Sequence, residues 1–219
     1  GLHLGRVVLG WIGVSIMFNA MVYIPAPDAI ALTFMSPIFA MLFSIFLLRE
    51  NVEKQRWLAA ACAFIGVIFL LRPNSWHISP IAFFCLIAAA AFGLEIICIK
   101  SLTKRERPIQ ILLFSNAIGA IIASLPLFYV ATKPSLSQWF GLISVGFLMV
   151  IGQTFFLFAI QKSEASMVSP YIYATLIFVV FFDLVFLGTK PDLNSIFGGL
   201  VIVAACIYMS YRESVIKKT

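Results

Sequence analysis

Residues 29–56 read AIALTFMSPIFAMLFSIFLLRENVEKQR and divide into two parts. The first part, Ala29–Leu48, contains no charged side chain, whereas Arg49, Lys54 and Arg56 follow directly after it. A helix needs about 20 apolar residues to cross the roughly 30 Å hydrocarbon layer of a membrane. Short loops rich in Lys and Arg stay on the cytoplasmic side. The stretch therefore predicts a membrane-spanning helix that ends in a cytoplasmic loop.

The same alternation of apolar runs and short polar connections recurs along the chain and predicts eight membrane spans. The spans are Val7–Ile24, Ala29–Leu48, Trp57–Leu71, Ser79–Ile99, Ile109–Val130, Trp139–Ile160, Met167–Leu187 and Asn194–Tyr211. The connections contain the turn-forming residues Pro, Asp, Asn and Ser. They include Pro25-Ala26-Pro27-Asp28, Arg72-Pro73-Asn74-Ser75, Lys133-Pro134-Ser135 and Lys190-Pro191-Asp192. No connection is long enough to hold a soluble domain.

The basic residues separate onto alternate sides of these spans. Arg72, Lys133 and Lys190 lie on one side, and the other 12 of the 15 Lys and Arg residues lie on the opposite side. The twelve are Arg6, Arg49, Lys54, Arg56, Lys100, Lys104, Arg105, Arg107, Lys162, Arg212, Lys217 and Lys218. Because Lys and Arg in short loops are retained in the cytoplasm, both ends of this chain are predicted to be cytoplasmic.

Composition also indicates a membrane protein. Hydrophobic residues make up 62% of the chain and charged residues 11%, whereas soluble domains have about 45–50% and about 25%. The net charge of +6 comes from the basic loops, so we expect the lipid bilayer as a partner and no nucleic acid.

The four cysteines all lie in apolar runs and form no C-x-x-C pair. This placement is typical of buried free thiols rather than of a disulfide or a metal site.

An internal repeat relates the two ends of the chain. When the chain is aligned with itself, Ile45–Glu50 lies over Leu184–Thr189, and Ala59–Val67 then falls over Gly198–Cys206 without a gap. The second and third spans thus match the seventh and eighth, and an odd separation of five spans makes the copies cross the membrane in opposite directions. Inverted repeats of this kind build many secondary transporters around a midplane site. Since the chain begins at Gly1, the first two spans of a ten-span protein are expected upstream.

Two blocks of sequence resemble the EamA type of the drug/metabolite transporter superfamily. The first contains Thr33-Phe34-Met35-Ser36-Pro37 and Leu47-Leu48-Arg49-Glu50, followed by Gln55-Arg56-Trp57 and Phe64-Ile65-Gly66-Val67. The second contains Glu164-Ala165-Ser166 and Val168-Ser169-Pro170-Tyr171-Ile172-Tyr173. The resemblance covers the whole chain as the last eight of ten helices. It implies an all-α membrane protein built as an inverted-repeat (5+5) bundle.

The resemblance also implies two units and a class of substrate. Residues 1–73 would be the remainder of the first repeat, family helices 3–5, and residues 74–219 the second repeat, helices 6–10. Within the family the chain is most similar to bacterial carriers of the S-adenosylmethionine uptake type, through Arg49-Glu50-Asn51 and Pro170-Tyr171-x-Tyr173. Family members often carry Glu near the positions of Thr175 and Thr189, where this chain has Thr. The substrate is therefore not inherited with the fold.

Glu95 and Asp183 are the two acidic residues inside the predicted spans. An ionised group at the bilayer centre costs about 2.5–3.5 kcal/mol, so such a residue normally faces a wet cavity or a partner. Glu95 is predicted to bind a proton or a cationic group of the substrate. The alternative is a neutral Glu bonded within the bundle, or one that reaches toward the cytoplasmic face. Asp183 lies near the outer end of its span, where contact with water explains it.

Further polar side chains in the spans are predicted to line a cavity for a small organic solute. They are Asn19 and Tyr23 in the first span, Ser36 in the second, Gln153 in the sixth, and Tyr171, Tyr173 and Thr175 in the seventh. Tyr23 and Tyr171 are equally compatible with the aromatic belt at a membrane surface. Ser36 belongs to a face of small residues that is typical of close helix packing. Pro37 and Pro170 remove backbone hydrogen bonds inside spans, either as gate kinks or as fixed kinks.

The sequence carries no signature of an enzyme, a cofactor or a metal site. His3 and His77 are far apart, and no phosphate loop or metal-ligand spacing is present. We therefore expect a secondary transporter of the bacterial inner membrane that moves a small metabolite by alternating access. S-adenosylmethionine or another amino-acid-like solute is the expected substrate, and a homodimer is left open. A non-transporting membrane scaffold or sensor that keeps the fold is the alternative.

Overall fold

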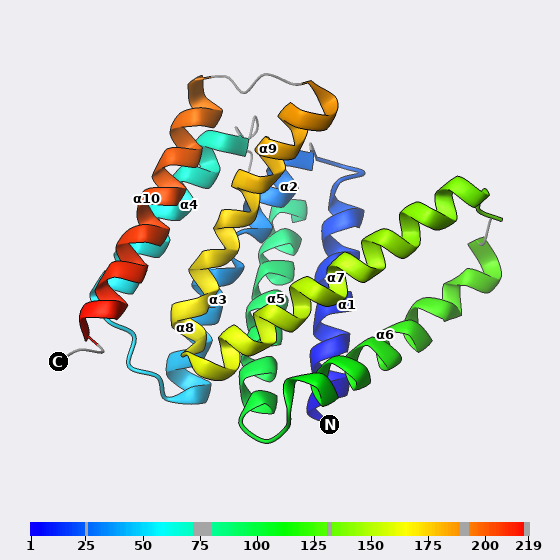
Figure 1. The fold of residues 1–219 in the computed structure, drawn as a ribbon, viewed down its shortest axis with the longest axis horizontal. Helices are drawn as coiled ribbons and strands as arrows, with labels where there is room; N and C mark the ends of the chain where they lie inside the picture. Colours follow the sequence, from blue (N-terminus) through cyan, green and yellow to red (C-terminus); the bar gives the residue numbers. More distant parts are fainter. Residues whose placement is uncertain (25, 72–79, 131–132, 189–192, 217–219) are drawn as a thin grey trace.

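The structure, a computed structural model, describes residues 1–24, 26–71, 80–130, 133–188 and 193–216. Every regular element in these ranges is helical, and the helices lie side by side as a tilted bundle (Figure 1). The prediction of an all-α protein is therefore confirmed for the part of the chain that the structure describes. The predicted turn at 72–75, the one at 190–192, and Ser79 lie outside the described residues.

Helices overlap each predicted span. They are α1 (Leu2–Ala20), α2 (Ala26–Thr33), α3 (Ser36–Phe43), η1 (Ser44–Leu48), α4 (Lys54–Leu71), α5 (Pro80–Thr103), α6 (Pro108–Val130), α7 (Leu136–Lys162), α8 (Ala165–Val168), η2 (Ser169–Ala174), α9 (Thr175–Leu187) and α10 (Leu193–Ile216). Sequence chemistry explains several of their starts. Pro80 and Pro108 are first residues of helices, where a missing N–H costs nothing. Ser135 and Gln138 form a capping box that begins α7.

Six of the described helical stretches have the length and apolar character needed to cross a membrane. They are Leu2–Ala20, Asp28–Leu48, Pro80–Thr103, Pro108–Leu125, Leu136–Lys162 and Ala165–Phe186. Large apolar side chains such as Phe46 and Phe186 are 76% exposed, as expected for a surface that faces lipid. A multi-pass, all-α membrane protein is thus confirmed, whereas the count of eight spans stays a prediction.

The second and seventh predicted spans are interrupted helices. The second consists of α2, α3 and the π-helical segment η1, and the seventh consists of α8, the 3-10 segment η2 and α9. Pro37 lies in the first turn of α3 and Pro170 in the first turn of η2, because proline cannot donate the backbone bond that a continuous helix needs. α3 contacts η2, so the two interrupted helices meet inside the bundle.

Glycines allow two pairs of helices to approach closely. α4 packs along α10, where a Cβ on Gly66 would lie 2.8 Å from the carbonyl oxygen of Gly198. α5 packs against α3, where a Cβ on Gly93 would lie 2.8 Å from Cβ of Phe39. Small residues have this role in membrane helices because lipid supplies no hydrophobic force between them.

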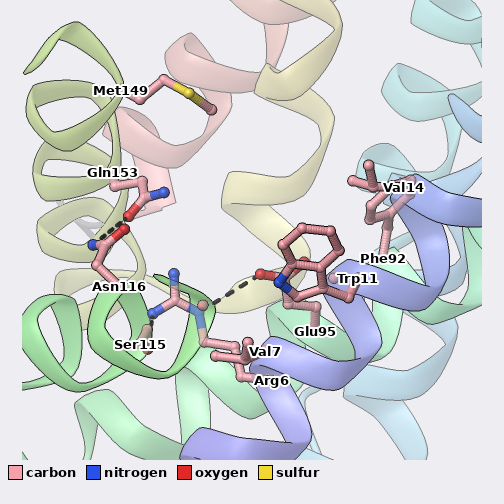
Figure 2. Close-up of a pocket in the computed structure, with 12 residues that line it drawn as sticks. Arg6, Val7, Trp11, Val14, Phe92, Glu95, Ser115, Asn116, Met149 and Gln153 are labelled. Atoms are coloured by element: carbon pink, nitrogen blue, oxygen red, sulfur yellow. Dashed lines mark hydrogen bonds and ion pairs between the residues drawn. The ribbon is translucent and has the colours of Figure 1, made fainter. Parts of the chain in front are cut away.

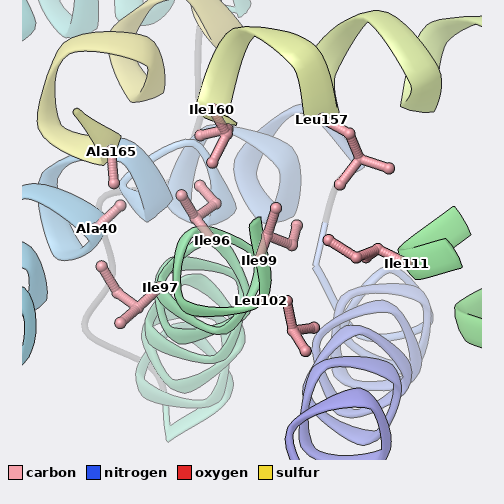
Figure 3. Close-up of a cluster of buried hydrophobic side chains, with 9 residues drawn as sticks. All are labelled: Ala40, Ile96, Ile97, Ile99, Leu102, Ile111, Leu157, Ile160 and Ala165. Carbon is pink, nitrogen blue, oxygen red and sulfur yellow. The ribbon is translucent and has the colours of Figure 1, made fainter. Parts of the chain in front are cut away.

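A buried apolar cluster joins the helices that surround the candidate site. It contains Ala40, Ile96, Ile97, Ile99, Leu102, Ile111, Leu157, Ile160 and Ala165. Figure 3 shows these side chains around the end of α5, with contributions from α3, α6, α7 and α8. The cluster fixes how α5 and α7 sit relative to each other. α5 carries the polar residues Glu95 and Lys100 next to the cluster, and α7 carries Gln153 and Lys162.

Candidate functional site

A pocket with charged and amide side chains in a largely apolar wall lies between α1, α5, α6 and α7 (Figure 2). Its volume is about 450 Å³, which lies in the usual range of pockets for small molecules. It is lined by Arg6, Val7, Gly10, Trp11, Val14, Phe92, Glu95, Ser115, Asn116, Gly119, Met149 and Gln153. We refer to it as the Arg6–Glu95 pocket, after the two charged residues in its wall.

Arg6 on α1 and Glu95 on α5 form an ion pair, with 3.6 Å between Nε of Arg6 and Oε1 of Glu95. Nη1 of Arg6 also donates a hydrogen bond of 2.8 Å to the hydroxyl oxygen of Ser115 on α6. The Arg6 side chain is 7% exposed and the Glu95 side chain 25% exposed. The guanidinium is therefore held between two partners in the protein, while the carboxylate keeps an open side toward the pocket.

Gly10 gives Glu95 access to this position. A Cβ on Gly10 would lie 3.0 Å from Oε2 of Glu95, which is tighter than nine in ten Cβ contacts in proteins. Gly10 is one helical turn after Arg6, so both residues lie on the face of α1 that meets α5. The absence of a side chain at Gly10 lets the carboxylate reach the guanidinium.

The opposite wall of the pocket carries a pair of amides. Nδ2 of Asn116 on α6 donates to Oε1 of Gln153 on α7 at 3.1 Å, and also to the backbone carbonyl of Leu112 at 2.9 Å. Trp11 lies beside Glu95, and Met149 lies on the same wall as Gln153 (Figure 2). The pocket thus combines opposite charges, amides and apolar walls, which suits a small organic molecule with both charged and apolar parts.

The structure separates the residues that the sequence singled out. Glu95 and Gln153 lie in the Arg6–Glu95 pocket. Asn19 and Tyr23 line a second hollow of about 510 Å³ with Phe84, near the other end of α1. The roles of both sets in substrate binding stay predictions.

The remaining predicted residues lie in neither hollow. Ser36 is buried in α3. Tyr171 shares a hydrogen bond of 2.6 Å with Ser210, and the Thr175 hydroxyl donates to the carbonyl of Ile172 at 2.7 Å. Tyr173 is fully buried and stacks on Phe34, with 6.0 Å between ring centroids. The side chain of Asp183 lies outside the described residues.

Sequence reasoning missed Arg6. It counted Arg6 among the basic residues at span ends, because the first span was expected to begin at Val7. The helix begins at Leu2 and places Arg6 inside it with 6% exposure. The spacing of Arg6 and Gly10 could have indicated this site. Residues four apart lie on the same helix face, so the charged side chain of Arg6 is next to a position without a side chain. The partners on α5 and α6 are about 90 and 110 residues away, which the sequence could not reveal.

Comparisons with known proteins bear on the family of the chain. The model of the EamA-like transporter family matches residues 3–72 and 79–211. The chain is similar to the S-adenosylmethionine uptake transporter of Rickettsia prowazekii, with 25% identity over 96% of this chain and 72% of the relative. It is similar to the pseudopaline exporter CntI of Pseudomonas aeruginosa, with 28% identity over 94% and 73%. The riboflavin transporter of Rhizobium johnstonii is 30% identical over 96% and 70%.

The fold also has a solved counterpart. A protein of known crystal structure superposes with a TM-score of 0.74 at 16% identity, covering 95% of this chain and 87% of that one. The family and the relatives are transporters rather than enzymes, and the apolar helices indicate a multi-pass protein of the bacterial inner membrane. The chain belongs to the EamA-like transporter family of the drug/metabolite transporter superfamily.

Proposed function

We propose that this protein is a secondary transporter that binds a small organic metabolite in the Arg6–Glu95 pocket and moves it by alternating access. The observation that carries the proposal is the ion pair itself, which lines a pocket between helices that are long and apolar enough to cross a membrane. Charged side chains at such depth are costly and are typical of substrate or ion pathways. The family resemblance supports eight spans of a ten-helix 5+5 bundle, with residues 1–73 and 74–219 in separate repeats and both ends of the chain in the cytoplasm.

The pocket favours a substrate that carries a cationic group together with an anionic or polar group. Glu95 offers the open side of its carboxylate, while Arg6 retains N–H groups beyond those that face Glu95 and Ser115. Trp11 provides an aromatic face beside the carboxylate (Figure 2), and aromatic faces attract organic cations. S-adenosylmethionine or another amino-acid-like solute has this combination of groups, and the relatives from Rickettsia support it.

Uptake into proteoliposomes tests the proposal. The full-length protein is reconstituted, and labelled S-adenosylmethionine is compared with neutral and anionic metabolites, with and without a pH gradient. Saturable uptake of one solute is expected, and Glu95→Gln is expected to reduce it at least tenfold, because the loss of a charge-assisted interaction is worth about 1.5–3 kcal/mol. Arg105→Gln, which is exposed on the loop after α5 and lies outside the pocket, is the control and should transport normally.

Two outcomes would count against this function. Wild-type uptake by Glu95→Gln with an unchanged pH dependence would remove Glu95 from substrate or proton binding. No uptake of any solute by a folded protein, together with no thermal shift on adding solutes, would favour the scaffold or sensor instead.

A further inference from the structure

A second polar cluster lies at the junction between α7 and α8. It consists of Glu50, which follows η1, Arg56 in the first turn of α4, and Lys100 near the end of α5, and we call these three residues the junction clamp. The clamp residues bond to the segment 160–166, which ends α7 and begins α8. Figure 1 shows α8 and the start of the chain at the same end of the bundle.

Glu50 holds the start of α8 by two backbone bonds. Its Oε1 accepts the N–H of Ala165 at 2.9 Å, and its Oε2 accepts the N–H of Ser166 at 3.0 Å. Both oxygens of one carboxylate are thus used on a segment that is distant in the sequence. Hydrogen bonds to an ionised acceptor are about twice as strong as neutral ones, so this contact ties the end of η1 firmly to α8.

Arg56 and Lys100 hold the same segment from the other two helices. Arg56 pairs with the carboxylate of Glu164 and donates to the hydroxyl oxygen of Ser166 at 2.8 Å. The ammonium of Lys100 donates to the backbone carbonyls of Ile160, at 2.8 Å, and Ser163. The last carbonyls of a helix lack partners within the helix, so Lys100 supplies bonds that α7 cannot make for itself.

The clamp shares two helices with the Arg6–Glu95 pocket. Lys100 follows Glu95 by five residues on α5, about 7.5 Å along the helix axis. Ile160 follows Gln153 by seven residues on α7, about 10.5 Å along that axis. α5 therefore carries one residue of the pocket wall and one clamp residue, and α7 carries one residue of the pocket wall and a carbonyl that the clamp binds. A movement of α5 against α7 that opens the clamp must also change the pocket.

We propose that Glu50, Arg56 and Lys100 hold one end of the transport path closed, and that the path opens at this end only when their bonds to residues 160–166 are released. The proposal rests on the transport function proposed above, because alternating access requires each end to close in turn. By the predicted topology this end is cytoplasmic. The clamp residues act on the conformation of the transporter and do not touch the substrate.

Cysteine labelling tests the clamp. Gly119 lines the pocket, and a Cβ there would meet no atom within 4 Å, so Gly119→Cys places a thiol in the pocket without strain. The four native cysteines are replaced by alanine, and a membrane-impermeant thiol reagent is added to vesicles of either orientation. Lys104→Cys, exposed just beyond the end of α5, identifies in a parallel sample the membrane face that carries the clamp.

Glu50→Gln is expected to raise the labelling rate of Gly119→Cys from the clamp face at least tenfold. Glutamine keeps the volume of Glu50 but can accept only one of the two N–H bonds, and one charge-assisted hydrogen bond corresponds to a factor of about ten or more. Labelling from the opposite face should fall. Arg105→Gln, which is exposed on the loop after α5, is the control and should label like the parent.

Exchanging the charges of Arg56 and Glu164 distinguishes the loss of a gate contact from a general loss of structure. Arg56→Glu should raise labelling from the clamp face, and adding Glu164→Arg should return it toward the parent rate by restoring an ion pair of reversed polarity. If Glu50→Gln does not fold, Ser166→Ala removes a single bond from Arg56 and should raise the rate by roughly fivefold. Unchanged labelling in folded Glu50→Gln and Arg56→Glu would overturn the proposal.

This experiment does not depend on the substrate. Labelling reports which face reaches the pocket even if no solute is transported. A clamp that behaves as expected in a protein without uptake or thermal shift would show that the clamp controls access to the pocket, and would count against the transport function. Uptake together with unchanged labelling would support the transport function and reject the clamp as a gate.

Discussion

Replacing Arg6 with glutamine is expected to lower the free energy of unfolding by about 2 kcal/mol. The change removes the ion pair across 3.6 Å to Glu95 and weakens the bond to Ser115. At an effective dielectric constant of about 20, two charges at this distance attract by roughly 4–5 kcal/mol. Desolvation opposes this attraction, and removing one partner of a fully buried pair costs about 3–5 kcal/mol.

The open side of Glu95 reduces that cost. The Glu95 side chain is 25% exposed, against 7% for Arg6, so pocket water can solvate the carboxylate once the guanidinium is gone. The expected loss is therefore about 2 kcal/mol, below the range of about 3–5 kcal/mol for a fully buried pair. Glu95→Gln should cost more than Arg6→Gln, because it leaves the more deeply buried Arg6 without its counter-charge.

The double variant Arg6→Gln/Glu95→Gln gives the decisive comparison. Two neutral amides leave no unpaired charge, so its loss should be smaller than the sum of the single losses by about 1–2 kcal/mol. Unfolding is followed by circular dichroism as SDS is titrated into detergent micelles of the purified protein. Arg105→Gln, on the exposed loop after α5, is the control and should stay within about 0.5 kcal/mol of the parent.

Additivity would refute the reasoning. If the double variant loses the sum of the two single losses to within about 0.5 kcal/mol, Arg6 and Glu95 do not interact energetically. Arg6 and Glu95 would then contribute to the pocket wall as two independent charges and not as an ion pair.

Four further substitutions follow from the packing. Gly10→Ala should reduce uptake at least fivefold, because the new Cβ would lie 3.0 Å from Oε2 of Glu95 and would push the carboxylate from its position. Normal uptake would show that the carboxylate has room to move. Gly66→Ala should destabilise the protein by about 1–3 kcal/mol in SDS titration, because its Cβ would lie 2.8 Å from a backbone carbonyl of α10. Gly119→Ala, in open space, should be nearly neutral in the same titration. Tyr173→Phe should leave stability unchanged or raise it by up to about 1 kcal/mol, because the buried hydroxyl has no hydrogen-bond partner among the described residues; a loss of uptake without a loss of stability would support its predicted place at the substrate.

Much of the architecture was predictable because the membrane imposes a simple rule on the sequence. Apolar runs of about 20 residues must be helices, since no water is present in the bilayer to satisfy the backbone. Helices overlap each predicted range. Proline at positions 37 and 170 predicted kinks in the second and seventh spans, and the structure shows that both spans are interrupted near these residues. The π-helical and 3-10 geometry of η1 and η2 was not predictable, because it depends on how these segments pack against each other.

The site was only partly predictable. Glu95 and Gln153 stand out in the sequence because polar groups in apolar runs need partners. Asn19 stands out for the same reason, yet it lies 13 residues beyond Arg6 on α1, about 20 Å along the axis, and so lines a different hollow. The sequence shows which polar groups need a partner, but it does not show which of these groups lie in the same pocket.

The sequence by itself determined the helical class, the approximate helix positions and the family, because hydropathy, turn residues and motif order are local properties. The tertiary structure decided the pairings that give these residues a role. Arg6 and Glu50 both read as ordinary charges at the ends of apolar runs. α1 packing against α5 turns Arg6 into the partner of Glu95, and the return of the chain at residues 160–166 turns Glu50 into a backbone acceptor for α8. Such contacts join residues that are far apart in the sequence, and only the packing of whole helices brings them together.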